Sequence, residues 1–386
     1  MLRLCAGLGS AENRAARACQ LIESGIDWNL LILIATQTGM MPLLYTFVTA
    51  HCGSLVPHPV IEDLRVRYAM NALRNLALAR ELVRVCALFE ENDIGVLALK
   101  GPILALHAYG DIAMRQFSDI DLLVRRPDVA RAAALLAAEN YQPRLDAPQA
   151  LLSDFFQSSE DIFSGRDGVA YVDLHWRLTP RYFPFAPSLD SVWRRAVSVD
   201  LEGHHVRALG AADQLLFICV HASKHAWSSF DSVAEVAHLL KRQETSGEIQ
   251  WPELLDQARA DGSRRMLIVA IALARDILDA AVPPAIAAEL AADRTSSALA
   301  VRLGNRLLGS AKAQSGGGWM VPLRTIDGRG RRIAYAADRA LAPTVDDWEF
   351  IRLPRTLFPL YYLIRPLRLA FRCVAAVRPP ARAEQG

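Results

Sequence analysis

Two carboxylates, Asp119 and Asp121, stand two residues apart in the otherwise apolar run 119–124. Side chains alternate between the two faces of a strand, so both carboxylates point the same way while the apolar residues of the run enter the core. An unpaired carboxylate in such a run is costly, and a divalent cation shared by both would remove that cost. The spacing therefore predicts a metal site suited to phosphoryl transfer. The alternative is that Asp119 caps a turn and that Asp121 is a charge at the strand edge.

Asp173 is the candidate for the third carboxylate that a two-metal site needs. Residues 161–176 predict a β-hairpin whose turn lies at Gly165–Gly168. On the second strand of this hairpin, Asp173 and His175 share one face, so Asp173 interrupts an apolar strand in the same way as Asp121. The alternative is that Asp173 pairs with an arginine across the sheet.

The turn at Lys100-Gly101 is the candidate for binding phosphate. It joins a predicted short strand over Gly95–Leu99 to a predicted helix over residues 103–109. A glycine at such a turn lets the backbone approach an anion, and the N-terminus of a helix favours negative charge. A proline follows the glycine and removes one N–H group, so we expect Lys100 or Arg115 to supply positive charge.

His221, Lys224 and His225 fall at helical spacing and gather on one face of a predicted helix that is otherwise apolar. If this face borders a cleft, Lys224 would hold a triphosphate and His221 would orient an acceptor or a phosphate. A solvated face with an incidental pair of histidines fits the spacing equally well. A zinc site is disfavoured, because no glutamate follows the first histidine as it does in H-E-x-x-H.

These segments resemble the uncharacterised nucleotidyltransferase family of the DNA polymerase beta-like superfamily. The resemblance covers most of the chain and is carried by LKGPILALHAYGDIAMRQFSDIDLLV, VDLHWRL, VHASKHAW and the C-terminal LYYLIRPLR. The fold that the resemblance implies is α+β, a mixed β-sheet core flanked by N-terminal and C-terminal helical subdomains. Members of this family often lie near genes for peptide or polysaccharide biosynthesis.

The resemblance makes Asp119, Asp121 and Asp173 the metal ligands and the catalytic carboxylates, and it makes Gly101 the turn that contacts phosphate. It implies transfer of a nucleoside monophosphate from an NTP, expected to be ATP, with Mg²⁺ or Mn²⁺ and release of pyrophosphate. The acceptor, a peptide, sugar or small molecule, is unidentified. This chain has a proline after Gly101, where the superfamily usually has Gly-Ser or Gly-Gly. The predicted nucleotide-binding residues are Lys100, Gly101, Arg115, His175, His221 and Lys224.

The length of 386 residues predicts several subdomains. We expect an N-terminal helical region over 1–92, the α/β core over 93–200, a helical subdomain over 201–314, and a linker with a basic, aromatic C-terminal arm over 315–386. The formal net charge of +2 gives no electrostatic argument for nucleic acid as a partner, so we do not expect one. Six scattered cysteines and the lack of a signal peptide or a long apolar run predict a cytoplasmic protein.

The C-terminal arm carries seven arginines and no acidic residue between Ile351 and Ala383, interleaved with aromatic and aliphatic side chains. This composition suits contact with a membrane surface or a protein partner, and an arm packed on its own domain is the alternative. The leading hypothesis is a metal-dependent nucleotidyltransferase. A non-catalytic nucleotide- or peptide-binding module and a peripheral membrane component of a biosynthetic assembly are the other two.

Overall fold

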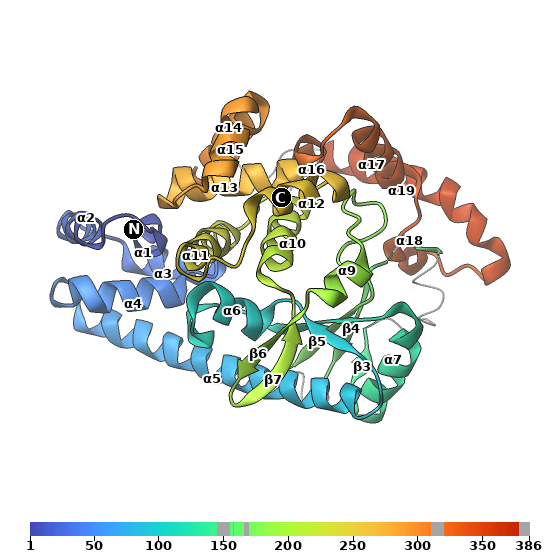
Figure 1. Ribbon diagram of the computed structural model, residues 1–386, viewed down its shortest axis with the longest axis horizontal. Coiled ribbons are helices and arrows are strands. Elements are labelled where there is room, and N and C mark those ends of the chain that lie inside the picture. The colour runs from blue at the N-terminus through green and yellow to red at the C-terminus, as the bar shows by residue number, and fades with distance from the viewer. Residues whose placement is uncertain (145–154, 157, 166–169, 310–319, 378–386) are drawn as a thin grey trace, which may run out of the picture.

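A seven-stranded mixed sheet lies at the centre of the computed structural model, which describes residues 1–144, 155, 156, 158–165, 170–309 and 320–377 (Figure 1). The strand order is β3-β4-β5-β2-β1-β7-β6. Two pairs, β2 with β5 and β1 with β7, are parallel, and the other neighbours are antiparallel. The bounds are β1 Val96–Ala98, β2 Asp119–Val124, β3 Gln142–Pro143, β4 Glu160–Ser164, β5 Tyr171–His175, β6 Val197–Leu201 and β7 His204–Ala208.

Helices precede, interrupt and follow this sheet, which confirms the predicted α+β class with a mixed sheet flanked by helices. The first group is α1 Leu2–Ala6, α2 Ala11–Glu23, α3 Trp28–Gln37, α4 Met41–Cys52 and α5 His58–Glu90. Within the sheet region lie α6 Gly101–Tyr109, α7 Val129–Ala138 and α9 Leu189–Arg194. The next group is α10 Ala211–Lys224, α11 Asp231–Ser246, α12 Trp251–Asp261, α13 Arg264–Leu278, α14 Pro284–Ala292 and α15 Arg294–Leu308. The last is α16 Met320–Thr325, α17 Arg329–Leu341, α18 Val345–Phe350 and α19 Tyr361–Val377.

The apolar segment 28–47 is divided between two helices, α3 and α4. Gly39 adopts a left-handed φ of +70°, which ends the first helix. Pro42 stands in the first turn of the second, where a missing N–H costs nothing.

The sheet extends past the predicted boundary at residue 200. β6 and β7 form an antiparallel hairpin, and β7 pairs with β1 through Ala98 and Ala208. The helical segment therefore begins at Ala211, with α10. The predicted hairpin of β4 and β5 is confirmed, while its turn at residues 166–168 lies outside the described residues.

The two faces of the sheet pack against different helices. On one face, Ile120, Leu122 and Val124 of β2 are buried against α5 and α7. α5 runs along this face, as Figure 1 shows, and presents a buried stripe at helical spacing that includes Leu78 and Leu82. The opposite face of β2 carries Asp119 and Asp121 and turns toward α6 and α10. The alternation predicted for this strand is therefore confirmed.

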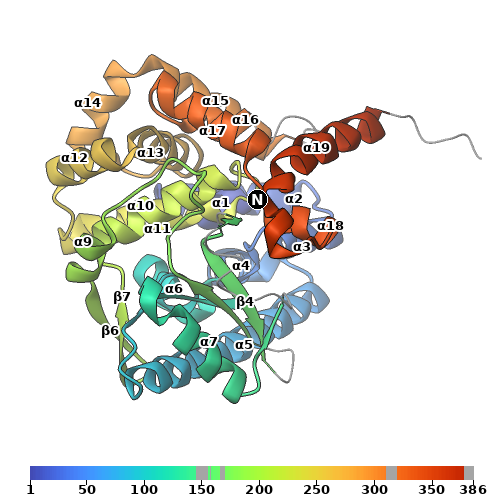
Figure 2. The same cartoon turned by 90° about the vertical axis from the view of Figure 1, so that its right-hand side faces the viewer.

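The C-terminal helices form an arm whose last helix, α19, projects from the body of the molecule (Figure 2). Its inner face is anchored: Tyr361 is fully buried, and Arg365 Nη1 lies 3.0 Å from Asp347 Oδ2 of α18. Its outer face leaves Leu363, Leu367 and Phe371 exposed. None of the helices in the described ranges is both long and apolar enough to cross a bilayer.

The turn that joins β1 to α6 depends on the backbone conformation of Gly101, which a substitution can test. Its φ of +58° lies in the left-handed region, and a Cβ at this position would lie 3.3 Å from the backbone oxygen of Asp119. We expect Gly101→Ala to lower the free energy of unfolding by about 1–2 kcal/mol through backbone strain, with a further loss from this contact. Urea unfolding monitored by circular dichroism measures the change.

Gly247→Ala is the matched control, because Gly247 has a φ of +64° but nothing within 4 Å of the added Cβ. It should therefore lose less stability than Gly101→Ala. Equal losses for the two variants would show that the approach of Gly101 to Asp119 is not tight.

Candidate active site

A pocket with a volume of about 380 Å³ opens on the face of the sheet that α6 and α10 cover. Eight of the nine predicted site residues line it, and Gly101 is the one that does not. The eight are Lys100, Arg115, Asp119, Asp121, Asp173, His175, His221 and Lys224. The fold thus brings together side chains from β2, β5, α10 and the turn after β1.

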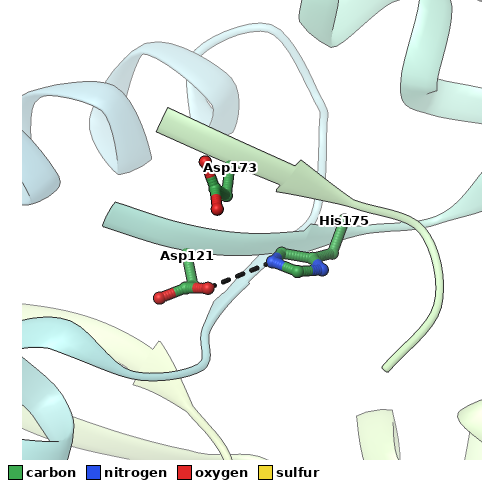
Figure 3. Close-up of side chains that lie close together, drawn as sticks. All are labelled: Asp121, Asp173 and His175. Atoms are coloured by element: carbon green, nitrogen blue, oxygen red, sulfur yellow. Dashed lines mark hydrogen bonds and ion pairs between the residues drawn. The ribbon is translucent and has the colours of Figure 1, made fainter. Parts of the chain in front are cut away.

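The parallel pairing of β2 with β5 places the two strand carboxylates opposite each other. Asp121 pairs in register with Asp173, and Leu123 pairs with His175. Figure 3 shows the side chains of Asp121 and Asp173 on the same side of these strands, with the ring of His175 turned toward Asp121. The ligand atoms of these three side chains lie within 4.8 Å of one another.

Asp121 is almost completely buried, and two cations meet its Oδ1 atom. Lys100 Nζ lies 2.9 Å from this oxygen, and His175 Nε2 donates to it at 3.1 Å. Burial raises the pKa of Asp121, but Lys100 and His175 outweigh it and hold that pKa well below the usual range. Asp121 is therefore ionised at any physiological pH. Its second oxygen, Oδ2, is buried and has no hydrogen-bond partner among the described residues.

The other two carboxylates carry the opposite shift. Burial and the charge of Asp121 raise the pKa of Asp173 to about 7. The same two causes raise the pKa of Asp119. Asp173 forms no ion pair with an arginine in the described part of the chain, so the cross-sheet alternative is not seen there. A cation bound at this site would displace a proton from Asp173 near neutral pH.

Glu160 is a site residue that the sequence analysis missed. It stands directly across β4–β5 from His175, and its Oε2 lies 3.0 Å from His175 Nδ1. Burial lowers the pKa of His175, but Glu160 and Asp121 more than compensate and raise it to about 9. The predicted hairpin indicated that a residue near Glu160 would lie across from His175. The sequence did not fix the length of the hairpin's turn, so it did not show which residue of the first strand pairs with His175.

His221, Lys224 and His225 all line the pocket from α10 and its C-terminal cap. Burial and the nearby lysines lower the pKa of His221 well below its usual value, so this ring is neutral. Its Nε2 lies 3.5 Å from Lys100 Nζ. Burial also lowers the pKa of Lys224. These positions favour the interpretation of this helix face as a pocket wall over that of a solvated face.

Buried amides hold this wall and the loop before β2 in place. Gln214 of α10 donates from Nε2 to the backbone oxygen of Leu99, at 3.0 Å. From α5, Asn71 and Asn75 donate to the backbone oxygen of Arg115, at 3.1 and 2.7 Å. The N-terminal helical region therefore contributes positioning contacts to the site, which its sequence did not reveal.

Arg115 is already engaged, although it borders the pocket. Its Nε lies 2.7 Å from Oε1 of Glu235 on α11, and both side chains are largely buried. Breaking a buried pair leaves an uncompensated charge, so Arg115 is held by this contact. Lys100 is likewise paired with Asp121, which leaves Lys224 as the predicted cation that makes no ion pair among the described residues.

The residues present fit a divalent cation. Carboxylate oxygens are the ligands that Mg²⁺ prefers, and Asp121 and Asp173 supply them from adjacent strands. Asp121 Oδ2 is the buried, unpartnered atom that a cation would satisfy. Asp119 lies two residues before Asp121 on the same face of β2 and lines the same pocket.

Comparison with known proteins gives the following similarities. A family model described as uncharacterised nucleotidyltransferase matches residues 24–279. No curated protein matches the chain. The solution structure of the antibiotic-resistance factor ANT(2'')-Ia is similar at 12% identity with a TM-score of 0.33, over 49% of this chain and 91% of that one. The crystal structure of an antigenic nucleotidyltransferase-like protein from Paracoccidioides brasiliensis is similar at 14% identity with a TM-score of 0.30, over 47% and 89%.

The raised pKa of Asp173 predicts how stability depends on pH. Its folded-state pKa of about 7 lies above the ordinary 3.8, so its charge destabilises the fold increasingly as the pH rises between these values, and fully above 7. Asp173→Asn removes that charge. Because Asp173 is only partly buried, we expect a modest gain in the free energy of unfolding, about 1–2 kcal/mol at pH 8 in EDTA and less at pH 5. Urea unfolding at the two pH values measures it.

When Mg²⁺ is added, Asp173→Asn should have a lower free energy of unfolding than the native chain, because a bound ion stabilises the native chain and not the variant. Asp256→Asn, at an exposed position of α12, is the control and should change little under either condition. A loss of stability in Asp173→Asn at pH 8 without metal would contradict the assignment of Asp173 as a destabilising charge.

Proposed function

Because the chain belongs to the uncharacterised nucleotidyltransferase family, we propose that it transfers a nucleoside monophosphate from an NTP to an acceptor. The matched region contains every residue that lines the pocket. The observation that carries the proposal is the in-register placement of Asp121 and Asp173 on parallel strands, beside the cations Lys100 and Lys224.

In this proposal, Asp119, Asp121 and Asp173 hold the divalent cations. When bound, such ions neutralise charge on the transferring phosphoryl group and lower the pKa of the acceptor hydroxyl. Asp121 is ionised before any ion arrives, since Lys100 and His175 depress its pKa. Asp173 gives up its proton on binding, and Glu160 keeps the ring of His175 oriented toward Asp121.

The helical wall supplies the contacts to substrate. Lys224 lies in the pocket without an ion pair to a described residue, and we assign it to the triphosphate. His221 is neutral, so it can accept a hydrogen bond from an acceptor hydroxyl and orient it. The N-terminus of α6, at Gly101, favours an anion at the same end of β1.

ATP is the proposed nucleotide, and a peptide, sugar or small molecule in a cytoplasmic biosynthetic route is the proposed acceptor. A non-catalytic binding module is the weaker alternative. The three proposed metal-binding carboxylates, together with the neutral ring of His221 in the same pocket, exceed what nucleotide binding alone requires.

The test is calorimetric titration of the full chain with each of the four NTPs, in Mg²⁺ and in EDTA. We expect one NTP to bind in a metal-dependent manner and Asp121→Asn to weaken that binding by at least about 10-fold. Transfer to an acceptor found with the preferred NTP should fall by about 100-fold or more, because the metal ion that would neutralise the reacting phosphate loses a ligand.

Asp173→Asn is the companion variant, since it leaves the pair between Lys100 and Asp121 intact and so separates metal binding from loss of fold. Asp256→Asn is the matched control with an unchanged pocket. Full metal-dependent binding in both pocket variants would overturn the metal assignment.

The outer face of α19 favours a second role, contact with an anionic membrane surface. Leu363, Leu367 and Phe371 lie on one side of this helix and are each more than half exposed. The inward arginines are neutralised by α18, whereas Arg352 and Arg355 are exposed nearby. Apolar side chains flanked by positive charge suit the boundary between headgroups and acyl chains.

Co-sedimentation with phosphatidylserine vesicles tests this role. The variant Leu363→Ser/Leu367→Ser/Phe371→Ser should bind at least about 10-fold more weakly than the native chain, because three apolar side chains are lost from the contact. The matched control, Val66→Ser/Met70→Ser/Leu73→Ser, removes exposed apolar side chains of α5 and should bind normally. Equal binding of the two variants would exclude α19 as the contact.

A further inference from the structure

A second cavity, with a volume of about 450 Å³, lies among α13, α15, α16 and α17. We call it the arginine cavity, because five arginines line it: Arg265, Arg294, Arg302, Arg324 and Arg332. It shares no lining residue with the pocket described above. Of the five, only Arg265 lies within residues 24–279, so the cavity is built mainly by the part of the chain beyond the family match.

The helical spacing of α15 shapes one wall of the arginine cavity. Arg294, Ala298 and Arg302 follow one another at intervals of four residues and therefore lie on one face. The small side chain of Ala298 leaves room between the two guanidinium groups. Arg324 and Arg332 approach from α16 and α17, so positive charge enters the cavity from three different helices in addition to α13.

Few acidic groups balance this charge. Asp327 Oδ1 lies 3.3 Å from Nε of Arg265, and Asp293 Oδ2 lies 3.8 Å from its Nη2. Both carboxylates also accept hydrogen bonds from backbone N–H groups. Asp327 accepts from Arg265, and Asp293 caps α15 by accepting from Ser296. The cavity therefore keeps an excess of positive charge.

Several of the guanidinium groups have no partner. Arg294, Arg302 and Arg324 lie at the exposed rim of the cavity and form no hydrogen bond or ion pair with any residue that the structure describes. Nη1 of Arg265 is buried and also lacks a hydrogen-bond partner there. The segment 310–319, which joins α15 to α16 outside the described residues, contains no acidic residue in its sequence. Within the described residues, the chain's own acids therefore form ion pairs with Arg265 alone among the five arginines.

We propose that the arginine cavity binds a small ligand that carries several phosphate groups. A guanidinium stays charged at every physiological pH, and its planar fork matches two oxygens of a phosphate. Four arginines with free donors suit an anion of several charges better than a single carboxylate. The cavity volume falls in the range of small-molecule sites, about 300–1,000 Å³, and is too small for a macromolecule.

The site lies one helix layer from the candidate active site. α13 and α16 both pack against α10, which carries His221 and Lys224. The inference does not depend on the proposed nucleotidyltransferase activity, since its test needs neither metal nor NTP.

The experiment is calorimetric titration of the full chain with inorganic tripolyphosphate in EDTA, at physiological salt. We expect Arg302→Gln/Arg324→Gln to weaken this binding by at least about 10-fold, because two guanidinium groups leave the cavity. The matched control is Arg17→Gln/Arg80→Gln, which removes the same charge from exposed positions of α2 and α5 outside the cavity. It should bind with the affinity of the native chain.

Circular dichroism and thermal unfolding establish that the variants fold. Arg294→Gln, at the exposed start of α15, is a milder second variant for the same titration. Equal tripolyphosphate binding by the native chain and the cavity variants would overturn the proposal, since any binding in the other pocket is unaffected by them. If the control variant lost as much tripolyphosphate affinity as the cavity variant, the binding would be non-specific charge attraction and the proposal would be overturned. Citrate that binds the cavity more tightly than tripolyphosphate would identify the ligand as a carboxylate instead. Tighter binding of a single-stranded 20-nucleotide DNA, lost in the cavity variant, would identify it as a nucleic acid. Either result would overturn the proposal.

Discussion

The parallel pairing of β2 with β5 is the constraint on which the site depends. It sets Asp121 opposite Asp173 and brings His175 within reach of Asp121. Side chains alternate with a period of two, so a slip of one residue would turn the carboxylates into the apolar core against α5. The register is held by the other face, where Ile120 and Leu122 are buried. Hydrophobic packing on one side of the sheet therefore positions the charges on the other.

The charges so positioned are only partly balanced. Lys100 and His175 neutralise Asp121, and Glu160 neutralises His175 in turn. Asp173 forms no ion pair with a described residue, and burial and the charge of Asp121 raise its pKa to about 7 despite the nearby His175. A site that keeps like charges together at a cost in stability is characteristic of function rather than of folding. Contacts from α5 and α10 to backbone oxygens beside the site offset part of that cost by fixing its walls.

Charge is distributed differently in the C-terminal third of the chain. In the arm, Arg365 turns inward to Asp347 while apolar side chains of α19 face outward, the reverse of an ordinary surface helix. In the arginine cavity, guanidinium groups from four helices converge with few acids between them. In our proposals, the first arrangement meets an anionic membrane surface and the second binds a ligand that carries phosphate groups. The family match ends at residue 279, before the arm and before four of the five arginines that line the cavity.

Local periodicity in the sequence determined which residues form the strand and helices of the core, and on which face Asp119, Asp121 and Asp173 stand. It also placed the strand-turn-helix at Gly101 and the face of His221 and Lys224, because these features depend on residues close together in the chain. Partners far apart in sequence were decided by the tertiary structure alone: Glu160 against His175, Arg115 against Glu235, and the arginine cavity. A repeating pattern shows which way a side chain points, whereas what it meets depends on strand register and helix packing across long separations, which no local pattern records.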